Sequence, residues 1–219
     1  MAEPAAEIRD HYHDHVRRDV IPHVPRAGGS LLDLGGGLGA TAARLKELGV
    51  ADRIGVVDMI APEAEALPID FRYSGNLEDM ALIDRVIVEQ GPFDTILALD
   101  ILEHLVDPWA IVARLHRGLK PGGRIVASIP NIRNYRALLP LLLRNQWQLA
   151  DAGILDRTHL RFFVRQSAIE LITSSGLELE AVAPSQSGGR KIALFRKLTL
   201  GLLNSFTDRQ YIVTVRRVD

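Results

Sequence analysis

Asp33 and the glycines that follow it are the residues whose types and spacing most clearly predict chemistry. Glycines stand at positions 35, 36, 37 and 39, between the apolar run 30–34 and a helical pattern that starts at Ala40. Glycine permits positive φ angles and a close approach of the backbone to a ligand. The free N–H groups at the start of the helix favour a polar or anionic group. We therefore expect a binding site for a cofactor that contains a nucleoside.

The glycine turn alone leaves two classes of cofactor open. Gly35, Gly37 and Ala40 also fit the dinucleotide fingerprint G-x-G-x-x-A, which would make the protein a dehydrogenase. Asp33 argues against that class, because a carboxylate repels a pyrophosphate but can help to hold the ammonium of an amino-acid tail. Asp58 ends a second predicted strand, where it can accept hydrogen bonds from ribose hydroxyls in either class.

Two further segments decide between these classes. Residues 93–108, FDTILALDILEHLVDP, read as a strand followed by an acidic loop, and residues 119–131, LKPGGRIVASIPN, read as a turn into another strand. With these motifs the chain resembles the class I S-adenosylmethionine-dependent methyltransferases over about residues 28–183. The resemblance implies S-adenosyl-L-methionine as the cofactor and S-adenosyl-L-homocysteine as its product.

The resemblance also implies which residues bind the cofactor. The glycine turn would pack against the methionine portion, with Asp33 near the ammonium and Asp58 at the ribose. Asn76 stands where the family more often has aspartate, and its amide can still accept from the adenine amino group. Plain core packing is the alternative for the two apolar members. The expected set is Asp33, Gly35, Gly36, Gly37, Asp58, Met59, Asn76, Leu77, Asp100 and Ile101.

Two histidines are the candidates for a general base. His104 follows the strand of residues 94–99, and His159 lies in the polar segment DRTHLR. An imidazole titrates near neutral pH and can take a proton from an acceptor hydroxyl. The alternatives are that His104 packs at the start of a helix and that His159 organises its loop.

A metal site is a competing hypothesis for the same region. Asp100, Glu103, His104 and His159 resemble the arrangement by which the small-RNA 2′-O-methyltransferases hold a divalent cation. Two oxygens and two imidazoles would suit manganese, iron, cobalt or zinc better than magnesium. The family's first acid is glutamate rather than aspartate, and no further nucleic-acid motif is present. We therefore expect no metal, and keep metal-assisted transfer as an alternative.

The acceptor is predicted from residues 131–163, which are too long for a simple connection and should form a lid. Residues 151–163 resemble a bacterial subset of these enzymes that is often linked to surface-polysaccharide synthesis. We expect in-line O-methylation of a sugar, a nucleotide-linked compound or another small, anionic acceptor, and no DNA partner. N- or C-methylation, as in methionine or quinone metabolism, and a binding module without catalysis stay open. The expected substrate-binding residues are Tyr135, Arg133, Arg157 and Arg161.

Composition and charge limit the classes of protein to which the chain can belong. The chain has 219 residues, 47% of them hydrophobic, and no cysteine, so disulfides and thiolate metal sites are excluded. We find no signal peptide pattern and no apolar run of about 20 residues, so we expect a cytoplasmic protein. The net charge of −1 hides basic segments at residues 129–165 and 190–219. Such segments are either solvated surface or contact an anion.

The elements that position these residues alternate as strand and helix. We expect one α/β domain over residues 1–219, with a Rossmann-like seven-stranded, mostly parallel sheet, an antiparallel last strand and helices on both faces. Residues 1–27 would form an N-terminal helical cover, with a helix over 7–21. Residues 184–206 would insert an amphipathic helix, 191–206, that packs within the protein, packs in a homodimer or contacts a membrane surface.

Overall fold

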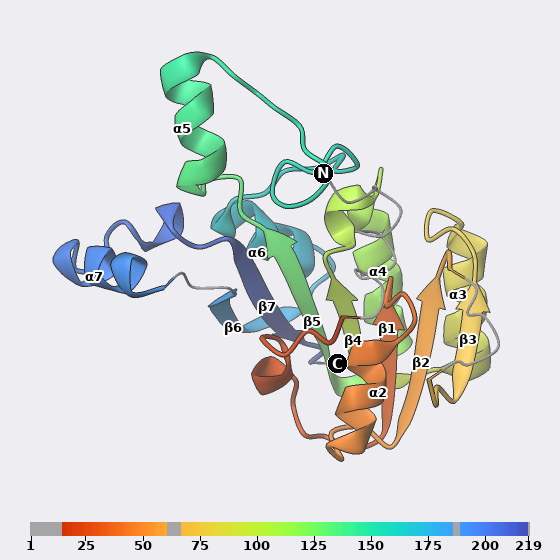
Figure 1. Cartoon of the computed structure of the whole chain (residues 1–219). Coiled ribbons are helices and arrows are strands. Elements are labelled where there is room, and N and C mark those ends of the chain that lie inside the picture. Colours follow the sequence, from red (N-terminus) through yellow and green to blue (C-terminus); the bar gives the residue numbers. More distant parts are fainter. Residues whose placement is uncertain (1–14, 61–66, 186–188, 219) are drawn as a thin grey trace.

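The computed structural model describes residues 15–60, 67–185 and 189–218. A seven-stranded sheet with the strand order β3-β2-β1-β4-β5-β7-β6 forms its centre (Figure 1). All pairs from β3 to β5 are parallel, and β7 runs antiparallel to both of its neighbours. The predicted α/β class, seven strands and antiparallel last strand are confirmed. The strands are β1 (Ser30–Leu34), β2 (Arg53–Asp58), β3 (Phe71–Ser74), β4 (Phe93–Leu99), β5 (Leu119–Pro130), β6 (Glu178–Ser185) and β7 (Gln210–Arg216).

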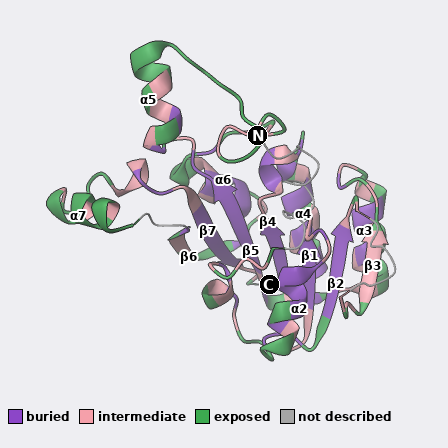
Figure 2. Ribbon diagram, in the orientation of Figure 1, coloured by how far each residue is buried: buried purple, intermediate pink, exposed green. Residues whose placement is uncertain are grey.

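Helices cover both faces of the sheet, because successive strand residues point to opposite sides. Leu31 belongs to a core cluster with Ala42 and Leu45 of α2, whereas Leu32 belongs to a second cluster with residues of α3, α4 and α6. Buried residues therefore fill the space between the layers (Figure 2). The helices are α2 (Ala40–Glu47), α3 (Met80–Gln90), α4 (Pro108–Gly118), α5 (Tyr135–Arg144), α6 (Arg165–Thr173) and α7 (Arg190–Leu198), with the 3-10 helices η1 (Ile21–His23), η2 (Leu102–His104) and η3 (Asn204–Phe206).

Side chains define where several helices begin. Asp79 accepts a hydrogen bond from the N–H of Ala81, so α3 starts at Met80. Asp107 caps α4, and Pro108 at the first helical position has no N–H that needs a partner. These caps place the acidic loops of residues 75–79 and 100–107 at the carboxyl ends of β3 and β4.

The predicted N-terminal helix is not confirmed. Residues 7–14 lie outside the described residues, residues 15–20 form coil and a turn, and only Ile21–His23 form a 3-10 helix. Pro22 falls inside that turn of helix. The segment instead packs through buried Val20 and Val24 on the core under α2. Burial of two apolar side chains thus fixes this segment without a regular helix.

The two insertions are less helical than predicted. Within residues 131–163 the one α-helix is α5, and the rest forms a loop with isolated bridges, so a helical lid is only partly present. The helix predicted over 191–206 ends at Leu198, and η3 follows it. Leu200 and Gly201 have φ angles of 49° and 79°, which a helix cannot contain.

Candidate active site

The glycine turn after β1 is a cradle made of backbone. Gly35, Gly37 and Gly39 have φ angles of 72°, 55° and 86°, and Gly39 is the N-cap of α2. A Cβ atom on Gly35 would lie 2.7 Å from the Cγ1 atom of Ile101, and one on Gly36 would lie 2.6 Å from the Cγ atom of Asp33. The turn therefore has no room for side chains, which is what a backbone that approaches a ligand requires.

Asp58 joins the end of β2 to this turn. Its Oδ2 atom accepts a hydrogen bond of 2.8 Å from the N–H of Gly37, and its Oδ1 atom accepts one of 2.9 Å from the N–H of Ile60. A carboxylate has about four acceptor positions, so capacity remains for ribose hydroxyls. Asp58 therefore lies at the carboxyl end of β2, as predicted.

Asp33 is the buried acid beside the glycine turn. Its exposure is 2%, and burial raises the pKa of its carboxyl to about 7, with a further rise from the negative charge of Asp58. The positive charge of Arg17 opposes this rise. A carboxyl in this environment ionises readily only when a cation comes close. The ammonium of an amino-acid tail is such a cation, so the residue fits its expected role.

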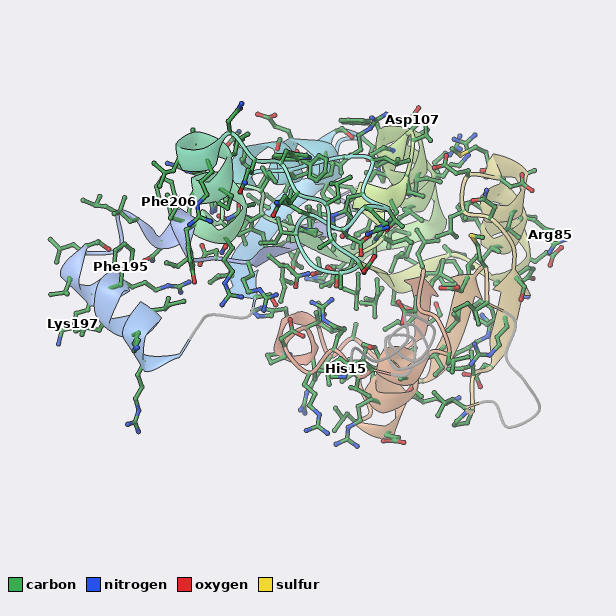
Figure 3. All side chains as sticks on the ribbon, turned by 45° about the horizontal axis from the view of Figure 1, so that its top comes forward. His15, Arg85, Asp107, Phe195, Lys197 and Phe206 are labelled. Carbon is green, nitrogen blue, oxygen red and sulfur yellow. The ribbon has the colours of Figure 1, made fainter. Side chains whose placement is uncertain are left out.

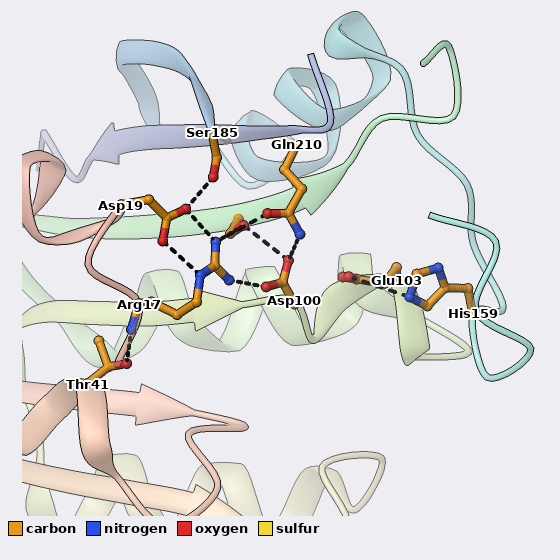
Figure 4. Close-up of polar contacts among 9 residues, drawn as sticks. Arg17, Asp19, Thr41, Asp100, Glu103, His159, Ser185 and Gln210 are labelled. Atoms are coloured by element: carbon orange, nitrogen blue, oxygen red, sulfur yellow. Dashed lines mark hydrogen bonds and ion pairs between the residues drawn. The ribbon is translucent and has the colours of Figure 1, made fainter. Parts of the chain in front are cut away.

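Asp100 is held in a network that the sequence did not reveal (Figure 4). It has a φ angle of 53°, and its carboxylate accepts hydrogen bonds from the Ser128 hydroxyl at 3.1 Å, from the Gln210 amide at 2.6 Å and from Arg17. Arg17 also donates to Asp19 at 3.0 Å. Burial raises the pKa of Asp100 against the opposing charge of Arg17.

Arg17 is the residue that sequence reasoning missed. Its partners Asp100 and Gln210 lie 83 and 193 positions away along the chain, so no local sequence motif could indicate the role of Arg17. Its backbone N–H donates to the Thr41 hydroxyl in α2. Arg17 therefore fastens the N-terminal segment across the ends of β4 and β5.

The adenine-side residues occupy three different environments. Met59 is 71% exposed, whereas Leu77 is 4% exposed and packs in the core. The Oδ1 atom of Asn76 accepts a hydrogen bond of 3.0 Å from the N–H of Glu78. The Leu77 side chain therefore packs in the core, which was the alternative to a contact with the cofactor. A contact of Leu77 with adenine stays a prediction.

A cluster of ionisable side chains lies one turn beyond the end of β4. Glu103 and His104 are in η2, and His159 reaches them from the loop after α5. The His159 Nε2 atom lies 3.9 Å from the Glu103 Oε1 atom, and the two imidazole rings are 4.7 Å apart at 76°. The N–H groups of Leu160 and Arg161 donate to the Glu103 carbonyl, which fixes the loop on η2. The two predicted base candidates are therefore in contact.

The chemistry of this cluster follows from its burial. Glu103 is 1% exposed, and among the described residues neither of its carboxyl oxygens has a hydrogen-bond partner. Burial and the nearby charge of Asp100 raise its pKa well above the usual value. Burial and His104 lower the pKa of His159, and its Nδ1 atom lies 3.2 Å from the Ile154 carbonyl. A neutral His159 must donate from Nδ1 to that carbonyl, so Nε2 keeps a lone pair.

The same three residues could hold a metal ion. Ligand atoms of Glu103, His104 and His159 all lie within 4.8 Å of one another. One carboxylate and two imidazoles suit zinc or another first-row transition metal. Asp100, the fourth residue of the metal hypothesis, is instead bound to Arg17, Ser128 and Gln210. Three of the four residues are thus brought together and one is not.

The predicted substrate-binding residues do not form one anion pocket. The Arg133 guanidinium lies 4.4 Å from the centre of the Phe206 ring, and Arg157 pairs with exposed Asp151 at 2.8 Å. The Tyr135 hydroxyl accepts from Arg136 on the surface of α5. The Arg161 guanidinium donates to the Val106 carbonyl. Their roles in substrate binding stay predictions.

An apolar pocket lies between α5 and the loop that follows it. Its volume is about 250 Å³. Aromatic rings connect it to the base candidates, because the Phe162 ring lies 6.3 Å from His159 and 5.2 Å from Trp147. The pocket is lined by Ile132, Arg133, Ala137, Leu138, Leu141, Trp147 and Val164.

This strand order, with buried acids and a glycine turn at the carboxyl ends of the strands, is typical of methyltransferase folds that bind a nucleoside cofactor. A family model described as a methyltransferase domain matches residues 7–182. The chain belongs to this family, and is a class I S-adenosylmethionine-dependent methyltransferase.

Curated relatives carry the name ubiquinone biosynthesis O-methyltransferase. One from Thiobacillus denitrificans is 26% identical over 205 residues, a match that covers 91% of this chain and 83% of that protein. One from Cereibacter sphaeroides is 28% identical over 169 residues, which covers 74% of this chain and 65% of that protein. The chain therefore spans just under two thirds of the length of this second relative.

Solved structures share the fold at lower identity. A methyltransferase from Archaeoglobus fulgidus has a TM-score of 0.59 at 16% identity, with 97% of this chain and 92% of that chain covered. The 1,6-didemethyltoxoflavin-N1-methyltransferase from Burkholderia thailandensis, solved with S-adenosylhomocysteine, has a TM-score of 0.60 at 16% identity over 100% of this chain and 92% of that chain. These likenesses show the fold alone. In the described part of the chain, no helix is long and apolar enough to cross a bilayer.

Proposed function

We propose that the protein methylates a hydroxyl group of its acceptor and that His159 is the general base. The observation that carries this proposal is the His159 imidazole, whose Nε2 atom lies 3.9 Å from the Glu103 Oε1 atom and whose ring contacts that of His104 just beyond β4. His104 is the second candidate, because its Nδ1 atom is already in contact with the Thr158 hydroxyl at 3.1 Å.

The proton transfer can be followed atom by atom. The His159 Nε2 lone pair accepts the acceptor's hydroxyl proton while the oxygen bonds to the methyl carbon. The resulting imidazolium donates through Nδ1 to Ile154 and through Nε2 toward a Glu103 oxygen that lacks another partner among the described residues. S-adenosylmethionine, when bound, would supply the methyl group, whose bond to the positively charged sulfur would break as the bond to oxygen forms, so that the neutral thioether S-adenosylhomocysteine leaves. Asp33, Asp58 and the glycine turn would hold its ammonium, ribose and methionine portions.

Supporting observations favour an acceptor with an acidic hydroxyl and an apolar part. A phenol, with a pKa of about 10, yields its proton to an imidazole far more readily than an ordinary alcohol does. Phe162 and Trp147 line the way from His159 to the apolar pocket. The relatives' printed name also refers to O-methylation in ubiquinone biosynthesis. These points favour a phenolic acceptor over the sugar that the lid sequence suggested, and give no support to a polysaccharide link.

A pair of histidine variants tests the base. His159→Asn keeps an amide donor for the Ile154 carbonyl but removes Nε2. We expect S-adenosylhomocysteine affinity, measured by calorimetry, to stay unchanged and methyl transfer to a small catechol to fall about 10²- to 10⁴-fold. His23→Asn, in η1, is the control and should change neither. Unchanged transfer by His159→Asn would remove His159 from the catalytic role.

Metal-assisted transfer is a second candidate, favoured by the spacing of Glu103, His104 and His159. It predicts that the purified protein contains a stoichiometric transition metal and that EDTA abolishes methyl transfer until the metal is restored. Glu103→Gln and His104→Asn would then both lower the metal content. Full activity in EDTA, with no metal found by elemental analysis, would leave His159 acting as a base without metal.

A further inference from the structure

Two helices stand outside the layered body of the protein. Figure 1 shows α5 and α7 projecting beyond the sheet on the side of β5, β7 and β6, and Figure 2 shows both as largely exposed. Helices of a globular protein normally bury their apolar stripe against a neighbour. These two leave theirs uncovered. The exposed leucines are Leu139, Leu141, Leu142 and Leu143 in α5, and Leu194, Leu198, Leu200, Leu202 and Leu203 in and after α7.

Several of these side chains are almost fully exposed. Leu143 is 76% exposed, Leu200 is 88% exposed and Leu202 is 83% exposed. Large side chains at that exposure contribute nothing to the core, and a cluster of them marks a surface that binds something.

The segment that follows α7 is fastened to the start of α5. The Asn131 side-chain amide donates to the carbonyls of Ser205 at 2.7 Å and Asp208 at 2.9 Å, and the Asn134 amide donates to the Asp208 carbonyl at 3.0 Å. The Arg133 guanidinium packs on the Phe206 ring. In Figure 3, Phe206 accordingly lies beside α5, whereas Phe195 and Lys197 lie farther out on α7. We call residues 131–150 and 189–207 together the leucine face.

The charge of the leucine face is of one sign. It contains seven basic residues and no acidic residue, although the whole chain carries a net charge of −1. One of the seven, Arg196, pairs with Asp208 just outside the face. The others keep the positive charge beside the leucines: Arg133, Arg136, Arg144, Arg190, Lys191 and Lys197.

We propose that the leucine face binds an anionic lipid bilayer. Leucines enter the acyl boundary while basic side chains contact phosphate headgroups, which is how interfacial helices bind membranes. A second copy of this chain fits less well, because a two-fold contact would bring two basic surfaces together. A nucleic acid would match the charge but would leave the exposed leucines without a partner. The proposal goes beyond the methyl-transfer reaction and does not depend on it.

Vesicle sedimentation with the full chain tests the proposal. We expect binding to phosphatidylglycerol-containing vesicles, little binding to phosphatidylcholine alone, and weakening at about 1 M salt, where the Debye length falls to about 3 Å. Leu200→Ser combined with Leu202→Ser, and Lys191→Glu combined with Lys197→Glu, should each weaken binding at least about tenfold.

Matched controls alter the same chemistry elsewhere. Val88→Ser removes an apolar side chain that is 82% exposed on α3, and Arg26→Glu reverses an exposed charge near β1. Both should bind vesicles as the unaltered protein does, and circular dichroism should show every variant folded. The proposal fails if the protein does not sediment with anionic vesicles, or if the leucine variants bind as well as the controls. It also fails if the leucine pair instead dissolves a dimer in ultracentrifugation, or if only RNA binds.

Discussion

The replacement Asp33→Asn should stabilise the protein while it removes cofactor binding. The unfolded chain gives up the Asp33 proton near pH 3.8, whereas the folded protein holds it to about pH 7. The wild type therefore loses stability as the pH rises between these values, and the loss is complete above pH 7. A difference of about three pH units corresponds to about 4 kcal/mol. Asparagine keeps the shape of the side chain and carries no charge.

Urea denaturation at two pH values measures this effect. We expect Asp33→Asn to exceed the wild type in unfolding free energy by about 2 kcal/mol at pH 5 and by about 4 kcal/mol at pH 8.5. Calorimetry with S-adenosylhomocysteine should show a large loss of affinity, because the ammonium loses its counter-charge. A stability difference that does not grow with pH would refute the buried carboxyl. Unchanged affinity would refute its contact with the cofactor.

Three further predictions concern a paired acid at the start of β4, the glycine turn, and the Arg17–Asp100 pair. Partial burial raises the pKa of Asp94, but Lys120 and the Ser30 N–H outweigh burial and leave the pKa below its usual value. Asp94→Asn should therefore lower the free energy of unfolding at pH 7, and this effect should disappear as the pH falls toward 3. In the same urea assay, this trend is opposite to that of Asp33→Asn. Gly36→Ala places a methyl 2.6 Å from the Asp33 Cγ atom and should weaken S-adenosylhomocysteine binding at least about tenfold in calorimetry; Gly189→Ala, which has open space around it, should leave the affinity unchanged. Arg17→Met leaves the Asp100 carboxylate without its cation and should cost about 3 kcal/mol in thermal or urea unfolding; the double variant with Asp100→Asn should recover part of that loss, and strictly additive effects would contradict the pairing.

The fold could be predicted because its signals are local. Each buried strand is a short apolar run, and the turns between strand and helix carry glycine, proline or a capping acid within a few residues. The glycine turn, Asp33 and Asp58 belong to that class of signal, since each lies next to the strand end that positions it. The boundaries that failed, in residues 15–20 and 191–206, depend on tertiary anchors such as the Arg196–Asp208 pair.

The site beyond the cofactor could be predicted only in part. His104 and His159 were singled out for their chemistry, but their contact depends on the backbone hydrogen bonds that fix the lid loop on Glu103. The four residues predicted to bind the substrate lie in one segment of the sequence but contact different parts of the structure. Tyr135 contacts Arg136 on the surface of α5, whereas Arg161 contacts the Val106 carbonyl. No spacing rule in the sequence describes where an irregular loop goes.

By itself, the sequence determined the α/β class and the carboxyl ends of the strands as the site, because these follow from the periodicity of strands and from the backbone freedom of glycines at one turn. Its resemblance to the class I methyltransferases, carried by Asp33 and by residues 93–108 and 119–131, implied S-adenosylmethionine as the cofactor. Only the tertiary structure decided which ionisable groups meet. In the folded chain, Asp100 pairs with Arg17 and His159 lies against Glu103. The leucines of α5 and α7 are exposed beside seven basic residues. The physical reason is that these contacts join residues far apart in the chain, and their energies depend on burial that no local pattern encodes.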